Sequence, residues 1–225
     1  MNNLNKKAWE GLIFFIVALA VLLFLPAGTL YYWQAWVYLI LFSLSVIAIT
    51  FYLMKKDPAL LARRVNAGAA AEKEKSQKII QFIAQFAFIA IFLIPAFDHR
   101  FVWSNVPAFI TIIADIFVVF GFFIVFLVFK ENSFTSAIIE VDKKQKVITT
   151  GPYSVIRHPM YSGALLMLAA TSPALGSWWG LLAFILLTFV IVWRLLDEER
   201  YLSKNLSGYS EYCKKVRWRL FPLIF

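Results

Sequence analysis

Four long apolar runs limit what this chain can fold into. They cover residues 9–25, 34–54, 79–97 and 106–129, close to the roughly 17–25 residues with which a helix crosses the hydrocarbon core of a bilayer. In lipid, the backbone polar groups of each run must bond within the run itself, and a helix achieves this. With 61% hydrophobic and only 16% charged residues among 225, the chain is predicted to be an all-α, polytopic integral membrane protein.

A fifth apolar run, 160–196, is too long for one crossing. The sequence "TSPALGS" interrupts it, because Pro173 and Gly176 both disfavour a continuous helix. We therefore expect a helical hairpin of 159–173 and 177–198, which makes about six membrane segments with a short fifth one. The predicted organisation is an N-terminal four-helix membrane region, 1–129, and a C-terminal region of loop, hairpin and tail, 130–225, together forming one compact domain.

The basic residues orient these segments. Of the 22 Lys and Arg residues, two precede the first segment, seven lie in 55–78, five in 130–158 and seven from Arg194 onward. With six alternating segments these 21 share one face, and only Arg100 lies on the other. Because Lys and Arg concentrate on the cytoplasmic side, both termini are predicted to be cytoplasmic. The net charge of +9 is thereby explained by topology and by attraction to anionic membrane lipids, so no nucleic-acid partner is expected.

The cysteine content and the absence of targeting signals bear on the type of membrane and on metal binding. Cys213 is the single cysteine, which excludes an internal disulfide and a cysteine-rich metal site. Without an organelle signal or a lumenal loop typical of glycosylation, the sequence favours a bacterial-type inner membrane. No metal and no obligate protein partner are expected.

The stretch "GPYSVIRHPMYSG", residues 151–163, lies against the start of the hairpin. Pro159 suits the first position of a helix, where its missing N–H would be unpaired anyway. His158 is then expected at the helix mouth, with Arg157 just outside and Tyr161 on the first turn. Alone, Arg157 and Tyr161 are equally compatible with a cytoplasmic anchor and an interfacial aromatic; together with His158, the cluster favours a functional site.

A second cluster, "WRLLDEERYL", ends the last apolar segment. Arg194 and Glu198 are four residues apart and share a helix face, whereas Glu199 points about 100° away. We therefore expect only one of the two glutamates to face the same pocket as Arg194. A solvated helix end with an internal ion pair is the alternative. The hairpin favours a site, because it returns this cluster to the membrane face on which His158 lies.

Three further charged or polar residues need interpretation. Asp115 is the only acid deep in a predicted span, where ionisable groups are costly. It either pairs with a polar neighbour or lines a substrate path. His99 and Arg100 on the far face are interpreted as an ordinary loop.

Taken in order, "TTGPYSVIRHPMYSG", the Arg194, Glu198 and Glu199 set, "GYSEYCKKV" and the closing Pro222 resemble the isoprenylcysteine carboxyl methyltransferase family. The wider group includes phospholipid N-methyltransferases. The resemblance covers about 130–222 and implies S-adenosylmethionine bound at the cytoplasmic end of the hairpin, with Arg194 facing the acceptor. It implies cofactor contacts from Gln145, Lys146, Val147, Ile148, Tyr153, His158, Pro159, Met160, Tyr161 and Glu198.

These residues suit such chemistry. Glu198 can pair with the cofactor's ammonium group or accept from its ribose hydroxyls, and the ring of Tyr153 can face the sulfonium. A carboxylate acceptor is already a nucleophile that Arg194 can hold, while an amine acceptor needs a base, for which His158 and Glu199 are the candidates. Arg194, His158 and Glu199 are therefore the predicted catalytic residues.

The function predicted from the sequence is methyl transfer to a lipophilic acceptor that enters from the bilayer, with carboxyl O-methylation favoured. Three alternatives stay open. They are a phospholipid N-methyltransferase, an NADPH-dependent enzyme resembling the sterol reductases, which carry a similar "RHPxY" stretch, and a membrane protein that keeps the scaffold without catalysis.

Overall fold

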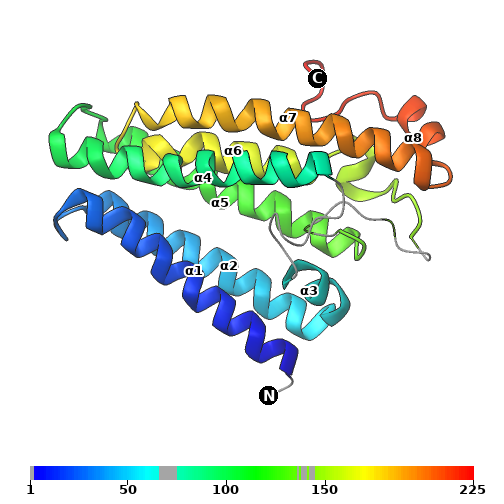
Figure 1. Ribbon diagram of the computed structural model, residues 1–225, viewed down its shortest axis with the longest axis horizontal. Helices are drawn as coiled ribbons and strands as arrows, with labels where there is room; N and C mark the ends of the chain where they lie inside the picture. Colours follow the sequence, from blue (N-terminus) through cyan, green and yellow to red (C-terminus); the bar gives the residue numbers. More distant parts are fainter. Residues whose placement is uncertain (1–2, 66–74, 136, 138–140, 142–144) are drawn as a thin grey trace.

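The computed structural model describes residues 3–65, 75–135, 137, 141 and 145–225. These residues form eight α-helices and one 3₁₀ turn (Figure 1). In chain order they are α1 (Asn3–Ala27), α2 (Trp33–Lys56), α3 (Pro58–Val65), α4 (Lys75–Phe101), α5 (Ala108–Glu131), η1 (Gly151–Ser154), α6 (Pro159–Ala174), α7 (Gly180–Asn205) and α8 (Tyr209–Lys215).

Five of these helices, α1, α2, α4, α5 and α7, are long and apolar enough to cross a membrane. The short fifth segment of the prediction corresponds to α6, which has 16 residues. The predicted all-α, polytopic membrane fold is therefore confirmed.

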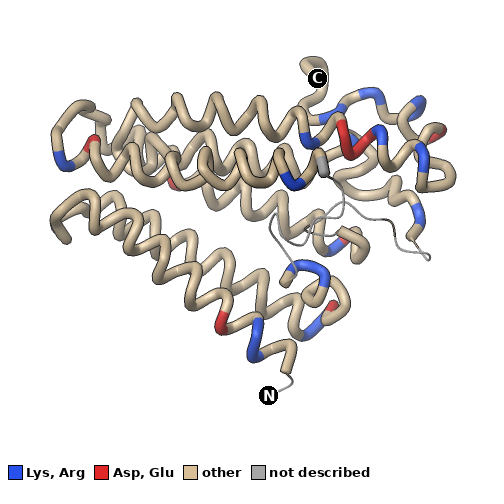
Figure 2. The backbone as a smooth tube through the Cα atoms, viewed as in Figure 1, with Lys and Arg blue, Asp and Glu red and all other residues tan. Residues whose placement is uncertain are grey.

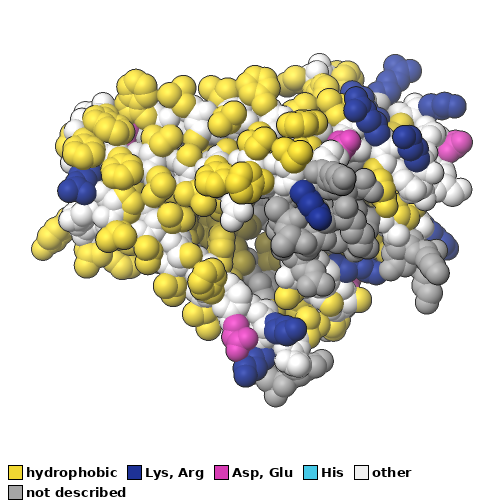
Figure 3. Space-filling view, in the orientation of Figure 1, with side chains coloured by type: hydrophobic (Ala, Val, Ile, Leu, Met, Phe, Trp, Pro, Cys, Tyr) yellow, Lys and Arg dark blue, Asp and Glu magenta, His cyan; other side chains and the backbone are white. Residues whose placement is uncertain are grey.

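Four helices, α4 to α7, run side by side, while α1 and α2 form a pair inclined to them (Figure 1). Most Lys and Arg residues gather at the end of the molecule that carries α3 and α8, and the opposite end holds few charges (Figure 2). Apolar side chains cover the body between the two ends (Figure 3). This distribution is that of a membrane-embedded apolar body with its basic residues gathered at one end.

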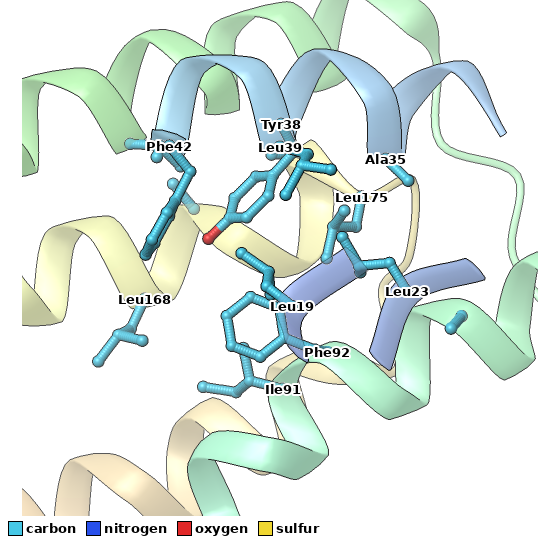
Figure 4. Close-up of a cluster of buried hydrophobic side chains, with 14 of the residues drawn as sticks. Leu19, Leu23, Ala35, Tyr38, Leu39, Phe42, Ile91, Phe92, Leu168 and Leu175 are labelled. Carbon is cyan, nitrogen blue, oxygen red and sulfur yellow. The ribbon is translucent and has the colours of Figure 1, made fainter. Parts of the chain in front are cut away.

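The main core lies where the α1–α2 pair meets the other helices. Leu23 of α1, Tyr38 of α2 and Phe92 of α4 are fully buried there (Figure 4). Tyr38 also shares a hydrogen bond of 3.0 Å with the hydroxyl of Thr171 on α6. The N-terminal helices and the hairpin therefore share one core.

Two glycines bring α5 and α6 unusually close together. A Cβ atom added to Gly121 would lie 2.7 Å from the carbonyl oxygen of Gly163, and one added to Gly163 would lie 2.9 Å from that of Gly121. Only the missing side chains allow this backbone approach, as at other small-residue contacts between membrane helices. Because α6 begins at Pro159, the contact fixes the position of the sequence that precedes it.

The hairpin turn follows the sequence signals. Helix α6 ends at Ala174, and Gly176 takes a φ of +74°, a left-handed conformation that glycine adopts at little cost. Helix α7 continues to Asn205, beyond the predicted residue 198. Leu202 in its last turn and Leu206 directly after it pack against Tyr209 and Tyr212, so tertiary contacts extend the helix past the apolar run.

At the opposite end, the loop interpretation of His99 and Arg100 is wrong. Helix α4 continues through both residues to Phe101 despite the internal Pro95. The ring of His99 stacks on that of Tyr32 with centroids 3.9 Å apart. This packing holds the helix beyond its apolar part.

Asp115 is 4% exposed in α5, and neither of its carboxylate oxygens has a hydrogen-bond partner in the described part of the chain. The alternative in which Asp115 pairs with a polar neighbour therefore does not hold there.

Candidate functional site

A cavity opens at the basic end of the hairpin, between the start of α6, the end of α7, α8 and the segment 145–148. All ten predicted cofactor contacts and Arg194 line it. The lining residues among them are Gln145, Lys146, Val147, Ile148, Tyr153, His158, Pro159, Met160, Tyr161, Arg194 and Glu198. The hairpin therefore brings the two predicted clusters to one opening.

His158 is held at the mouth of α6 from two sides. It is the residue that precedes the helix, and Pro159 takes the first helical position as expected. The backbone N–H of His158 donates to the carbonyl oxygen of Arg219 at 2.9 Å, and that of Arg157 donates to Trp218 at 2.9 Å. The chain after α8 thus folds back over the motif and fixes its backbone.

Glu199 lies beneath the motif in a buried ion-pair network. Its Oε1 atom is 3.0 Å from Nη1 of Arg157 and 3.2 Å from Nε2 of His158, and its Oε2 atom accepts from Nε of Arg219 at 2.9 Å. Glu199 does not line the cavity, whereas Glu198 does. The prediction that one glutamate shares the pocket with Arg194 is confirmed. With both oxygens engaged, Glu199 has the environment of a structural anchor rather than of a free base.

Glu198, Tyr161 and Arg194 form the polar wall of the cavity. The hydroxyl of Tyr161 donates to Oε2 of Glu198 at 2.6 Å and accepts from Nε of Arg194 at 3.2 Å. The rings of Tyr161 and His158 are 5.8 Å apart. Tyr161 is therefore part of the site and not an interfacial aromatic. Arg157, buried against Glu199, is likewise no lipid-facing anchor.

Further tyrosines also line the cavity. The hydroxyl of Tyr153 accepts from Nδ2 of Asn132 at 3.0 Å, and burial raises the pKa of Tyr153 well above its usual range. Tyr153 therefore presents a neutral ring. Tyr212 donates to the carbonyl oxygen of Tyr153 at 2.7 Å. The hydroxyl of Tyr209 is different, because it is buried in the cavity wall without a partner in the described chain.

The lining fits a cofactor of the predicted chemistry. A buried hydroxyl without a partner is costly, which makes Tyr209, a residue of the cavity lining, a candidate for a hydrogen bond to a bound ligand. Val147 and Ile148 add peptide groups that make no backbone hydrogen bond within the described residues. Glu198 adds a carboxylate suited to an ammonium or to hydroxyls.

Asn132, Tyr209 and Tyr212 are among the lining residues that were not predicted from the sequence. Asn132 ends α5 and reads as an ordinary helix terminus. The two tyrosines stand in "GYSEYCKKV", where their spacing of three places both on one face of a short helix. That spacing was the signal that could have indicated them.

The fold and site define a class: an integral membrane protein whose terminal helical hairpin carries a polar and aromatic cavity at its basic end. Residues 109–208 match the model of the phospholipid methyltransferase family. The predicted resemblance to this group of membrane proteins is thereby confirmed for the stretch from α5 to the end of α7.

Two curated relatives share parts of the chain. Protein-S-isoprenylcysteine O-methyltransferase B of Arabidopsis thaliana is 35% identical over 92 residues, which cover 38% of this chain and 45% of the relative. Delta(14)-sterol reductase TM7SF2 of Mus musculus is 33% identical over 84 residues, which cover 36% of this chain and 20% of the relative. The match therefore spans less than half of either relative.

Proposed function

We propose that this protein is an S-adenosylmethionine-dependent methyltransferase that acts on a lipophilic acceptor at the cytoplasmic face of the membrane. Carboxyl O-methylation, like that named for the isoprenylcysteine relative, is the favoured reaction. The observation that carries the proposal is the meeting of His158, Glu198 and Arg194 at one cavity within the region that matches the methyltransferase family.

The cofactor supplies an electrophilic methyl group, and the residues of the cavity hold it. Glu198 pairs with the ammonium group or accepts from the ribose hydroxyls. The Tyr209 hydroxyl and the peptide groups of Val147 and Ile148 take further polar groups, and the neutral ring of Tyr153 favours a neighbouring cation. His158 closes the wall beside Tyr161, where its contact with Glu199 keeps the ring in place.

Arg194 is the residue for the acceptor. Methyl transfer is an in-line displacement that gains mainly from positioning and from exclusion of water. A carboxylate acceptor needs no base, because it is already a nucleophile, and the guanidinium of Arg194 orients it by a charge-assisted pair. A reaction without a base agrees with the state of Glu199, whose carboxylate is already engaged by Arg157, His158 and Arg219.

Calorimetric titration with S-adenosylmethionine tests the cofactor assignment. We expect binding by the wild type, a strong loss in Glu198→Ala and His158→Ala, and wild-type affinity in the control Glu211→Ala, which replaces an exposed glutamate of α8 outside the cavity lining. Equal affinity in all four proteins would contradict the proposal. Transfer of a labelled methyl group to prenylcysteine analogues and to extracted lipids then identifies the acceptor. Binding without any transfer would indicate a scaffold without catalysis.

The identity with the sterol reductase over 84 residues supports a second candidate, an NADPH-dependent membrane enzyme. The carboxylate of Glu198 disfavours it, since it would repel a phosphorylated dinucleotide in the cavity. Thermal unfolding in the presence of each cofactor separates the two candidates. Stabilisation by NADPH and not by S-adenosylmethionine would support the reductase.

A further inference from the structure

The guanidinium of Arg194 is held from three elements at once. Besides the bond from Nε to Tyr161, its Nη1 atom donates to Oε1 of Gln77 at 2.8 Å, and its Nη2 atom donates to the carbonyl oxygen of Ala137 at 3.2 Å. Gln77 belongs to the first turn of α4. It therefore comes from the N-terminal region, outside residues 109–208 that match the family.

Gln77 is completely buried, and both the oxygen and the nitrogen of its side-chain amide make hydrogen bonds. Its Nε2 atom donates to Oδ2 of Asp197, which also accepts from the hydroxyl of Ser76 at 2.8 Å. An ionised carboxylate can only accept and a guanidinium can only donate. Asp197 therefore binds the NH₂ group of Gln77, and the carbonyl oxygen of the same amide faces Arg194.

We infer that Gln77 is a positioning residue that sets the orientation of Arg194 and thereby the affinity for the anionic group of the acceptor. The inference rests on the proposed function, in which Arg194 holds that group. It gives the N-terminal helices a part in acceptor binding. Gln77 has no direct bond to Glu198 within the described residues and reaches it only through Arg194 and Tyr161.

The first test compares Gln77→Leu with Gln85→Leu in the full-length protein. Gln85 lies on the same helix but is exposed, so it is the matched control. We expect Gln77→Leu to raise KM for a prenylcysteine acceptor by about tenfold or more, since one charge-assisted hydrogen bond is worth about 1.5–3 kcal/mol. The Kd for S-adenosylmethionine should change less than KM, because Gln77 touches Arg194 directly and reaches Glu198 only through Arg194 and Tyr161. An unchanged KM would overturn the inference.

Three further variants separate positioning from general damage to the fold. In an Arg194→Ala background, Gln77→Leu should have no further effect on KM, because a residue that acts only through Arg194 is non-additive with it. Gln77→Glu alone should impair acceptor binding, since it places two carboxylates together. Combining it with Asp197→Asn restores the donor and acceptor pattern and should lower KM below that of Gln77→Glu alone. Additive losses, or no such lowering of KM, would contradict the positioning role.

Direct binding of the prenylcysteine analogue without cofactor gives a readout that does not need catalysis. We expect Gln77→Leu to weaken this binding as much as it raises KM. If the wild type binds the analogue but transfers no methyl group, the proposed function fails while the affinities still decide the role of Gln77. If the wild type does not bind the analogue, the inference fails as well.

Discussion

The hydroxyl of Tyr161 donates to the carboxylate of Glu198 at 2.6 Å and also accepts from Arg194 at 3.2 Å. One phenol thus connects the residue proposed for the cofactor to the residue proposed for the acceptor. It also ties the first turn of α6 to the end of α7. The relationship makes Tyr161 the structural link between the two substrate positions.

Tyr161→Phe should therefore weaken the binding of both the cofactor and the acceptor. Loss of hydrogen bonds to two charged groups, each worth about 1.5–3 kcal/mol, predicts a loss of roughly tenfold or more in affinity on each side. Titration calorimetry gives the Kd for S-adenosylmethionine, and initial rates give KM for the acceptor. A change in one value alone would show that the phenol does not couple the two positions.

Tyr209 and Tyr212 allow a paired test of the cavity. The Tyr209 hydroxyl has no partner in the described chain, whereas that of Tyr212 donates to the Tyr153 carbonyl. Tyr209→Phe should leave the free energy of unfolding without ligand unchanged or improved. It should weaken the binding of S-adenosylmethionine by about two- to tenfold, as expected for one neutral hydrogen bond of about 0.5–1.5 kcal/mol. Tyr212→Phe should instead destabilise the ligand-free protein, and the reverse pattern would refute the assignment.

Much of this arrangement could be predicted from local sequence. Apolar run lengths indicate the spanning helices, and Pro173 with Gly176 indicates the hairpin. The hairpin in turn places His158 and Glu198 at one end, because an antiparallel pair of helices returns the chain to its starting face.

The partners of Glu199 and Arg194 could not be predicted, because they come from tertiary contacts that leave no periodic pattern in the sequence. Arg219 reaches Glu199 only because the chain after α8 folds back. Gln77 reads as an ordinary polar residue at a helix start, and its neighbours Asp197 and Arg194 are more than one hundred residues away in sequence. His99 was misread because hydropathy falls before the helix ends.

The buried network around Glu199 predicts a stability effect. Glu199→Gln leaves Arg157 buried without its counter-ion, and breaking a buried pair costs about 3–5 kcal/mol. We expect the lower part of that range, since Arg219 is 33% exposed and is partly solvated on its own. Chemical unfolding in detergent measures the change, with Glu211→Gln as the exposed control. A loss below about 1 kcal/mol, the median for a surface pair, would contradict a structural role.

The predicted orientation can be tested by cysteine labelling. In a Cys213→Ser background, Tyr31→Cys places a thiol in the turn between α1 and α2, where the side chain is 95% exposed, and Ser207→Cys places one between α7 and α8. With both termini cytoplasmic, a membrane-impermeant maleimide added to intact cells should label position 31 and not position 207. Labelling at 207 alone would show that the topology is the reverse of the predicted one.

The close α5–α6 contact at Gly121 can be tested against a glycine without neighbours, Gly11 of α1. Gly121→Ala adds a methyl group 2.7 Å from the Gly163 carbonyl and 2.8 Å from Cβ of Met167, so the helices must separate. Overpacking of this kind costs about 1–3 kcal/mol. Gly11→Ala in α1 meets nothing within 4 Å and should be neutral or stabilising by up to about 1 kcal/mol, because alanine favours a helix over glycine. Thermal unfolding of both variants measures the difference. Since α6 carries the motif at its first turn, Gly121→Ala should also weaken S-adenosylmethionine binding, and Gly11→Ala should not. Equal stability and equal S-adenosylmethionine affinity of the two variants would show that neither the fold nor the site needs the close approach of α5 and α6.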